Sequence, residues 1–398
     1  MSKTKIDRTP LSGAESVAQA MRQINPEVVA AYPITPQTGI MHAFTAFVND
    51  GDVDTEMIRV ESEHSAMSAT LGASAAGVRA MTATSSNGLA LMHEIVYIAA
   101  STRLPIVMPV VNRALSGPIN IHCDHSDTMA ERDSGWVQIY CENNQEAYEM
   151  TLLAIRLAEH KDILLPVMVC QDGFITSHGV EGVKLYKDSI VKKFLGKYKP
   201  KHPLLDTKNP ITIGPLDFYD YYFEHKRQQS EAIHNVRKVF PKLVKEFKKI
   251  SGKDYGFIES YMMDDAKEAI VVMSSSAGTT KEVVDRLRKE GRKVGMVKIR
   301  MFRPFPISEI KEVLKGVDIV AVLDRVESFG AVGGPLFNEI RSSLYDYNNK
   351  PKIVNYVFGL GGRSYTPELG RQVFDEISKD KNSKDYEHNL VRYLGVRN

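Results

Sequence analysis

Apolar and polar positions from residue 27 to about residue 172 alternate between short apolar runs and segments with helical spacing. The apolar runs VVAAY, RAMTAT, PIVMPVV and PVMVC are separated by stretches such as HSAMSATLGASAAG and QEAYEMTLLAIRLAEH. Strands that are apolar on both faces are typical of a parallel sheet covered by helices on both sides. The pattern predicts an α/β domain, and ligands of such sheets collect beyond the carboxyl ends of the strands.

A second alternation of the same kind begins near residue 256. The apolar runs AIVVM, KVGMVKI, VDIVAVL and KIVNYVF are separated by amphipathic segments such as TTKEVVDRLRKEG. Between the two alternations, residues 180–255 are rich in Lys, Tyr and Pro and end in an amphipathic pattern from Tyr221 to Ile250, which predicts a connecting helix. We therefore expect one domain over residues 1–255, with residues 180–255 as an excursion, and a second α/β domain over residues 256–398.

Composition and charge narrow the class of protein. The chain has 398 residues, of which 43% are hydrophobic, and this size fits two domains. Lys and Arg total 51 against 49 Asp and Glu, so no overall basic field favours nucleic acid or an anionic membrane. No run approaches the roughly 20 apolar residues of a membrane span, and the start MSKTKIDRTP lacks the apolar core of a signal peptide. We expect a cytoplasmic protein.

The cysteines and the stretch HCDHSD, residues 122–127, are the candidates for metal binding. Cys123, Cys141 and Cys170 form no CxxC pair, so a zinc knuckle or a cluster built from this chain alone is not expected. Adjacent residues on a loop rarely converge on one ion, and no HExxH pattern supports a metal. We predict no metal here and expect HCDHSD to be a loop that lines a polar cleft. The chain also lacks a P-loop and a GxSxG elbow.

Two candidate binding residues follow predicted strands. In AYPITPQTGI, two prolines bracket an Ile-Thr pair directly after a strand, so a sharp turn presents Thr35. Arg113 follows the strand LPIVMPVVN and precedes the mostly small residues ALSG, a position from which its guanidinium can hold a carboxylate through two parallel hydrogen bonds. The alternative for Arg113 is a surface pairing with a local acid.

Glu61 and Glu63 stand at the start of a predicted helix rich in Ala, Ser and Gly. They are explained either as helix-start acids favoured by the macrodipole or, for Glu63, as a carboxylate that bonds a ligand across a chain interface. The turn TSSNG, residues 84–88, joins a strand to a helix. We expect Ser85 or Ser86 to be the N-cap, with amide donors open to an anion or a polar ring.

Taken together, the motifs of this chain resemble one family. YPITP, VESEHSA, TATSSNGLALM, PVVNRALSGP, DHSDTMAERDSGW and QDGFITSH in the first half, with KIRMFRPFP, AVLDRVESFGAVGGPLF and FGLGGR in the second, resemble α subunits of the 2-oxoacid:ferredoxin oxidoreductase family, of the pyruvate:ferredoxin oxidoreductase (pyruvate synthase) type. The resemblance runs nearly end to end, except for residues 181–255.

The resemblance implies a fold and roles for several residues. The first domain would be a thiamine diphosphate-binding domain of the pyrimidine type, and the second would resemble the transketolase C-terminal domain. Glu63 would bond the pyrimidine N1′ and favour the imino tautomer, whose exocyclic nitrogen removes the thiazolium proton. Thr35 and Arg113 would hold the carboxylate or keto oxygen of the substrate. The remaining coenzyme contacts implied are Pro33, Ile34, Ser86 and Asn87.

The resemblance also implies partners. The Mg²⁺-diphosphate motif GDG of thiamine enzymes occurs nowhere in this sequence. A β subunit would therefore carry the diphosphate site with Mg²⁺ and a [4Fe-4S] cluster, with γ and ferredoxin-like δ subunits beside it. The reaction implied is the reversible oxidative decarboxylation of pyruvate with coenzyme A to acetyl-CoA and CO2, with ferredoxin as electron acceptor.

Three alternatives stay open. The same chemistry could serve a branched-chain 2-oxoacid, an aromatic glyoxylate, 2-oxoglutarate or oxalate. The chain could also be a non-catalytic scaffold whose Glu63 and Arg113 make interface salt bridges. A transketolase-like sugar enzyme ranks last, because it needs the missing diphosphate motif in the same chain.

Overall fold

The amino-terminal half folds around a seven-stranded sheet in the order β12-β6-β7-β5-β4-β2-β3. The computed structural model describes residues 8–383 and 386–397. All neighbouring strands of this sheet are parallel except the edge strand β12, which pairs antiparallel with β6. The strands are β2 (Val28–Ala31), β3 (Glu56–Arg59), β4 (Ala80–Met81), β5 (Val107–Asn112), β6 (Val137–Tyr140), β7 (Val167–Asp172) and β12 (Met301–Arg303).

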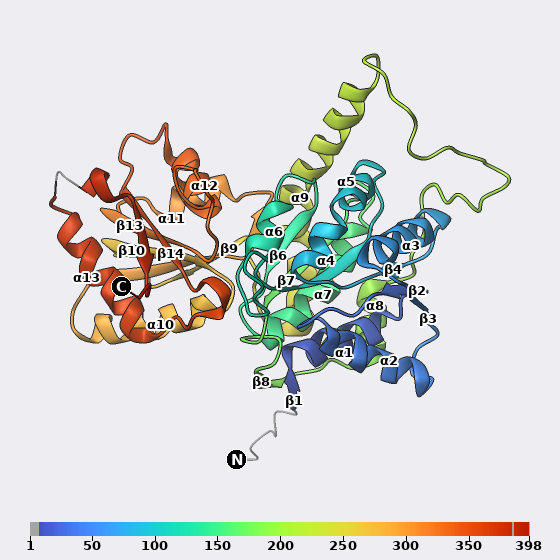
Figure 1. The fold of residues 1–398 in the computed structure, drawn as a ribbon, viewed down its shortest axis with the longest axis horizontal. Helices are drawn as coiled ribbons and strands as arrows, with labels where there is room; N and C mark the ends of the chain where they lie inside the picture. The colour runs from blue at the N-terminus through green and yellow to red at the C-terminus, as the bar shows by residue number, and fades with distance from the viewer. Residues whose placement is uncertain (1–7, 384–385, 398) are drawn as a thin grey trace.

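Helices cover both faces of this sheet (Figure 1). One apolar cluster joins the sheet to α1, α2, α7, α8 and α9, while a second cluster joins it to α3 and α5 and continues into the second domain. Because both faces are buried, the strands need no polar alternation, as the apolar runs predicted. The helices are α1 (Gly13–Ile24), α2 (Thr38–Asn49), α3 (Glu63–Ala76), α4 (Ser86–Leu91), α5 (His93–Ser101), α6 (Ser126–Ala130), α7 (Asn144–Ala158), α8 (Asp188–Leu195) and α9 (Tyr222–Ser251).

The carboxyl-terminal half contains a six-stranded sheet in the order β15-β14-β13-β10-β11-β9. Helices α10 and α13 pack together, as do α11 and α12. The elements are β9 (Ile258–Tyr261), β10 (Glu268–Met273), α10 (Ser276–Lys289), β11 (Val294–Ile299), α11 (Ile307–Val313), β13 (Ile319–Asp324), α12 (Pro335–Leu344), β14 (Lys352–Phe358), η1 (Leu360–Gly362), α13 (Pro367–Asp380), η2 (Tyr386–Asn389) and β15 (Val391–Leu394).

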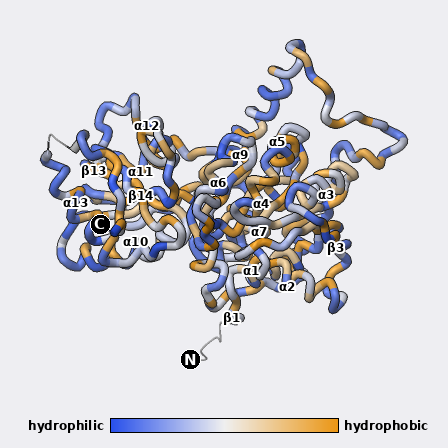
Figure 2. The backbone as a smooth tube through the Cα atoms, viewed as in Figure 1, coloured by the Kyte–Doolittle hydropathy of each residue, from blue (hydrophilic) through white to orange (hydrophobic). Residues whose placement is uncertain are grey.

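The segment between the two alternations begins and ends with regular structure. Strand β8 (Val180–Val183) pairs with β1 (Thr9–Ser12), and α9 confirms the predicted connecting helix to within one residue at each end. The intervening chain and the first turns of α9 project from the body of the protein (Figure 1), and hydrophobic and hydrophilic residues alternate along this arm (Figure 2). Every helix in the described part of the chain is too short or too polar to span a lipid bilayer.

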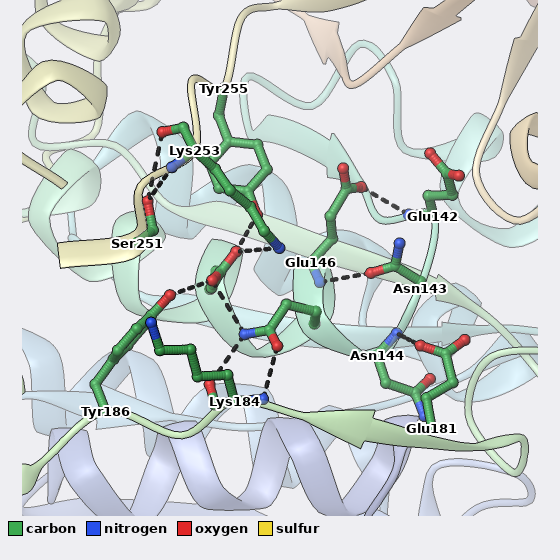
Figure 3. A network of polar contacts seen from close by, with 12 residues as sticks. Glu142, Asn143, Asn144, Glu146, Glu181, Lys184, Tyr186, Ser251, Lys253 and Tyr255 are labelled. Atoms are coloured by element: carbon green, nitrogen blue, oxygen red, sulfur yellow. Dashed lines mark hydrogen bonds and ion pairs between the residues drawn. The ribbon is translucent and has the colours of Figure 1, made fainter. Parts of the chain in front are cut away.

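A polar network anchors both ends of the excursion to α7 (Figure 3). The fully buried Glu149 accepts hydrogen bonds from the hydroxyls of Tyr186 and Tyr255. The Nζ of Lys253 lies 3.4 Å from the same carboxylate, and the amide of Asn144 donates to a Glu181 carboxylate oxygen at 3.2 Å. Burial is the largest cause that raises the pKa of Tyr255, and the charge of Glu149 adds to it.

One strand from beyond the predicted boundary at residue 255, β12, belongs to the sheet of the first domain. Met301 and Arg303 of β12 lie beyond the boundary in sequence and pair with Ile139 and Gln138 of β6 in the first sheet. The fully buried Phe302 lies between these two residues and contacts Tyr140 and Phe305 through their rings. The two sheets therefore share one apolar layer, and the division of the chain at residue 255 stays a prediction.

Candidate active site

Three strand ends bring the predicted residues to one edge of the first sheet. Strands β2, β4 and β5 run parallel, so the turns that follow them, at Thr35, Ser86 and Arg113, emerge on the same side. Glu63 reaches this edge from β3, the neighbour of β2, because α3 begins directly after that strand. The carboxyl edge of the sheet is therefore the candidate active site.

Arg113 is held over the turn that carries Thr35. Its side chain is buried, with 7% of the residue exposed; Nη1 donates to the carbonyl of Thr35 at 2.9 Å and Nε donates to the carbonyl of Asn120 at 3.0 Å. In the described part of the chain, no carboxylate pairs with this guanidinium and Nη2 has no hydrogen-bond partner. Arg113 therefore makes no salt bridge with a described residue, and the free edge of its guanidinium is available for an anion.

Thr35 lies exposed beside this guanidinium. Pro33 is also exposed, and Ile34 is half-buried with its amide 3.4 Å from Oε1 of Gln37. The Thr35 hydroxyl has no hydrogen-bond partner within the described chain. The bond from Arg113 goes to the Thr35 carbonyl. The turn thus places Thr35 and the Arg113 guanidinium together at the rim of the site.

Glu63 is a buried carboxylate without a partner. It is the first residue of α3, whose N-cap Ser62 accepts from the amide of Ser65 at 3.2 Å, and 7% of Glu63 is exposed. It makes no hydrogen bond or ion pair with any described residue. The carboxylate therefore keeps its full capacity to accept a hydrogen bond from a donor outside the chain.

The turn TSSNG lies against the Glu63 side chain. A Cβ added to Gly88 would meet Oε1 of Glu63 at 2.7 Å and Oγ1 of Thr84 at 2.6 Å. Glycine is therefore needed at residue 88 for this close approach. The Oγ1 of Thr84 is itself buried and without a partner in the described chain. A carboxylate and an unsatisfied hydroxyl thus face the same small space.

Glu61 differs from Glu63 although it stands two residues away. It is exposed, its carboxylate accepts from the hydroxyl of Ser65, and this bond lowers the pKa of Glu61. The helix-start explanation therefore describes Glu61, while Glu63 has the burial and the open bonding capacity of a ligand-binding group.

The TSSNG turn confirms the predicted N-cap position but corrects the prediction of an open amide. Ser85 occupies the N-cap position of α4, but its side chain makes no capping bond; the amide of Ser86 donates instead to Oδ2 of Asp127 at 3.0 Å. The sequence predicted amide donors open to an anion, but the Ser86 amide is already bonded to Asp127 and is not available. The Ser86 hydroxyl donates to the carbonyl of Ala114 at 2.5 Å, and Oδ1 of the exposed Asn87 accepts from the amide of Ser116 at 3.1 Å.

The stretch HCDHSD packs against the second domain, where the amide of His125 donates to the carbonyl of Arg325 at 2.8 Å; that it lines a polar cleft stays a prediction. Cys123, His125 and Asp172 place ligand-type atoms within 4.8 Å of one another. However, Nη1 of Arg325 donates to Oδ2 of Asp172 at 2.9 Å and lies 3.8 Å from Sγ of Cys123. Burial raises the pKa of the Cys123 thiol well above its ordinary value, so the group stays protonated. The cluster is a buried contact between domains in which a guanidinium already supplies the positive charge.

The glycine-rich turn at η1 also reaches the site from the second domain. The carbonyl of Gly361 accepts from Nδ2 of Asn120 at 3.2 Å, and Asn120 in turn accepts from Nε of Arg113. A Cβ on Gly361 would meet Nδ2 of Asn120 at 2.3 Å. The motif FGLGGR was noticed in the sequence, but its contact with the Arg113 loop could not be predicted from it.

Comparison with known protein families identifies the chain. The family model for the thiamine diphosphate-binding domain of pyruvate flavodoxin/ferredoxin oxidoreductases matches residues 19–245, more than half of the chain. The chain belongs to this family. The model for core domain II of pyruvate:ferredoxin oxidoreductase matches residues 266–369, so both halves of this oxidoreductase subunit agree. The resemblance predicted from the motifs is confirmed.

Two curated relatives support the same conclusion. Pyruvate synthase subunit PorA from Thermotoga maritima is 62% identical over 392 residues, which cover 98% of this chain and 99% of the relative. Ketoisovalerate oxidoreductase subunit VorA from Pyrococcus abyssi is 44% identical over 374 residues, with 93% of each chain covered. This chain is therefore a subunit of a 2-oxoacid oxidoreductase, as predicted.

Solved structures agree on the fold. A 2-oxoglutarate:ferredoxin oxidoreductase from Magnetococcus marinus matches with a TM-score of 0.73 at 20% identity, covering 94% of this chain and 66% of that one. A split-gene transketolase matches with a TM-score of 0.51 at 11% identity, covering 93% of this chain and 96% of that one. These identities support the fold alone, and they confirm the predicted α/β class with its transketolase-like relationship.

The residues at the carboxyl edge fit the aminopyrimidine of thiamine diphosphate, the coenzyme of this family. An aminopyrimidine carries ring nitrogens and an amino group, and it needs a carboxylate or hydroxyl partner for each polar edge. The unpaired carboxylate of Glu63 and the unsatisfied Oγ1 of Thr84 face one another across Gly88 and offer such partners. The chain can therefore hold this half of the coenzyme.

Proposed function

We propose that this chain is the α subunit of a pyruvate synthase, which with coenzyme A converts pyruvate to acetyl-CoA and CO2 and passes the electrons to ferredoxin, in a reversible reaction. One observation carries the proposal: a buried, unpaired Glu63 and an Arg113 with a free Nη2 lie on the same sheet edge. The 62% identity with a pyruvate synthase subunit supports it.

In this proposal, Glu63 shares a proton with the pyrimidine ring nitrogen N1′ of the coenzyme. The bound coenzyme would displace water from this carboxylate, and a hydrogen bond is stronger where water does not compete for it. When bound, thiamine diphosphate supplies the nucleophilic carbon and accepts the electron pair left behind by CO2. The neighbouring Pro33, Ile34 and Asn87 form the rim of the coenzyme site, and the buried Ser86 places Asn87.

Arg113 and Thr35 hold the substrate. The Nη2 group of Arg113 bonds the carboxylate of the 2-oxoacid, while the Thr35 hydroxyl donates to the same group or to the keto oxygen. Two of the guanidinium nitrogens are already fixed by the carbonyls of Thr35 and Asn120, so the cation is oriented before the substrate arrives. Such orientation fixes the carboxylate for departure without placing an acid against the reacting carbon.

Partner chains complete the site. We propose that a β subunit supplies the diphosphate and Mg²⁺ site and a [4Fe-4S] cluster, and that γ and ferredoxin-like δ subunits join it in a cytoplasmic complex. The absence of GDG and of CxxC pairs from this sequence supports this division. The curated relatives are likewise named as subunits.

Pyruvate is the substrate that the site favours. The small Ala114 and Ser116 follow Arg113, and Thr35 stands where a second cation would suit a dicarboxylate. We expect the assembled complex to show a kcat/KM for pyruvate at least about tenfold above that for 2-oxoisovalerate or 2-oxoglutarate, the discrimination typical of a pocket that rejects extra methylenes. Steady-state ferredoxin reduction with each acid checks this. A preference for 2-oxoisovalerate would assign the chain to the branched-chain branch of the family instead.

A further inference from the structure

Asp127 lies beneath the candidate active site and bonds two of its three turns. It stands in the first turn of α6, and only 1% of the residue is exposed. Its Oδ2 accepts from the backbone amide of Ser86 at 3.0 Å and from the backbone amide of Arg113 at 3.0 Å. One carboxylate oxygen therefore joins the turn after β4 to the turn after β5.

The other carboxylate oxygen of Asp127 also accepts two hydrogen bonds. Oδ1 accepts from Nδ2 of Asn112 at 2.8 Å and from the backbone amide of Thr128 at 2.7 Å. All four donors are neutral N–H groups, and within the described chain no lysine or arginine side chain bonds this carboxylate. Burial, the largest cause, raises the pKa of Asp127 to about 6, and the bonds from Arg113, Asn112 and Ser86 oppose that rise. Because all four partners are N–H donors, this carboxylate only accepts hydrogen bonds.

The backbone at Ser86 shows the effect of the hydrogen bonds to Asp127. Ser86 has φ of 47°, the left-handed region that residues other than glycine rarely adopt. Its amide is held by Asp127 and its hydroxyl by the carbonyl of Ala114, next to Arg113 in sequence. The conformation that presents Asn87 at the rim is thus tied at two points to the segment that carries Arg113.

We propose that Asp127 is a positioning residue for the reaction: it fixes the substrate-holding Arg113 relative to the coenzyme-facing turn Ser86–Asn87. This inference rests on the proposed function, because it assigns Asp127 to the same site. A carboxylate is needed for this role. In Asp127→Asn an NH2 group replaces one oxygen and meets two N–H donors, so whichever way the amide turns, two donors lose their acceptor.

The test uses the assembled complex with its partner chains. For Asp127→Asn we expect the KM for pyruvate to rise about tenfold or more, with a smaller fall in kcat. Binding of oxamate, a non-reacting analogue of pyruvate, is measured by calorimetry and should weaken by a similar factor. This second measurement reports the placement of Arg113 without depending on turnover.

Asp324→Asn is the matched control. Asp324 is fully buried at the end of β13, accepts from the amides of Leu336 and Phe337 at 2.9 and 3.0 Å and from Nδ2 of Asn355 at 2.9 Å, and burial likewise raises its pKa to about 6. The same chemical change there should lower the melting temperature but leave the KM and the oxamate affinity within twofold of the wild type.

Asn112→Ser is the second variant, because it removes one of the four bonds to Asp127 and keeps the other three. A roughly threefold rise in KM is expected, and this variant decides the question if Asp127→Asn does not assemble. A wild-type KM and oxamate affinity in a folded variant overturn the positioning role of Asp127. If instead the wild-type complex reduces no ferredoxin with pyruvate, the proposed function itself fails.

Discussion

Replacing Glu63 with Gln is expected to lower kcat of the assembled enzyme by about 10²–10⁴-fold, the usual contribution of a positioned acid–base group. The reason is that Glu63 is a buried residue whose carboxylate has no partner in the described chain and lies close to Gly88 and Thr84. The glutamine side chain has nearly the same shape but cannot share a proton with a ring nitrogen in the same way. Pyruvate-dependent reduction of ferredoxin measures the effect.

Glu61→Gln is the control for this prediction. It makes the same change at the same helix start, on an exposed carboxylate bonded to Ser65, and we expect activity within twofold of the wild type. Sizing chromatography of both variants separates catalysis from assembly. Full activity with weakened assembly in Glu63→Gln would instead support the scaffold alternative, in which Glu63 only makes an interface salt bridge.

Replacing Lys298 with Met is expected to lower the free energy of unfolding by about 3–5 kcal/mol, the cost of removing one partner from a buried ion pair. Lys298 is fully buried on β11, and its Nζ lies 2.8 Å from Glu146 and 2.7 Å from Glu259. Methionine fills a similar volume but leaves these carboxylates short of a cation. The network around the buried Lys298 consists of Glu142, Glu146, Glu259, Lys281, Lys298 and Arg300, of which Glu142, Glu259 and Lys281 are partly exposed.

The pH dependence of this network follows from its depressed pKa values. Burial alone would raise the pKa of Glu146, but Arg300 and Lys298 outweigh it and hold the pKa at about 2. The same balance, with Lys298 as the largest opposing cause, gives Glu259 a pKa of about 2. A carboxylate with a lowered pKa stabilises the fold above its unfolded value of 4.5, and this contribution is lost as the pH falls toward 2. The difference in the free energy of unfolding between the wild type and Lys298→Met should therefore be largest at pH 7 and become smaller below about pH 4.

Lys293→Met is the control for the stability prediction. Lys293 is exposed just before the same strand, 4.0 Å from Asp265, and such surface pairs contribute about 0–1 kcal/mol. Denaturant unfolding of both variants at pH 7 gives the comparison. Equal losses of stability in the two variants would contradict the role assigned to the ion pairs of Lys298.

The fold was predictable where local pattern decides it. The apolar runs that became β2, β5 and β7 are buried on both faces, and hydrophobic spacing alone located them. The amphipathic pattern of α9 was predicted for the same reason. β12 was not assigned to the first sheet, because pairing between Met301 and Ile139 is a contact between distant parts of the sequence that spacing does not encode.

The candidate site was predictable only in part. Strand ends pointed to Thr35 and Arg113, since the carboxyl edge of a parallel sheet gathers its turns. The family resemblance, rather than the pattern, gave Glu63 its proposed role, because its approach to Gly88 joins two turns that are distant in sequence. Asp127 was noticed only as a potential metal ligand. Its role as an acceptor for two backbone amides depends on which loops meet in space, so no local signal could have assigned it.

The central claim is that this chain supplies the pyrimidine half of a shared thiamine diphosphate site. The most direct measurement is the structure of the assembled complex with the coenzyme bound. The account predicts a Glu63 carboxylate oxygen within roughly 2.6–3.2 Å of the pyrimidine ring nitrogen N1′, the range of a catalytic hydrogen bond. A coenzyme whose pyrimidine lies away from Glu63, bonded by residues of another chain alone, would contradict it.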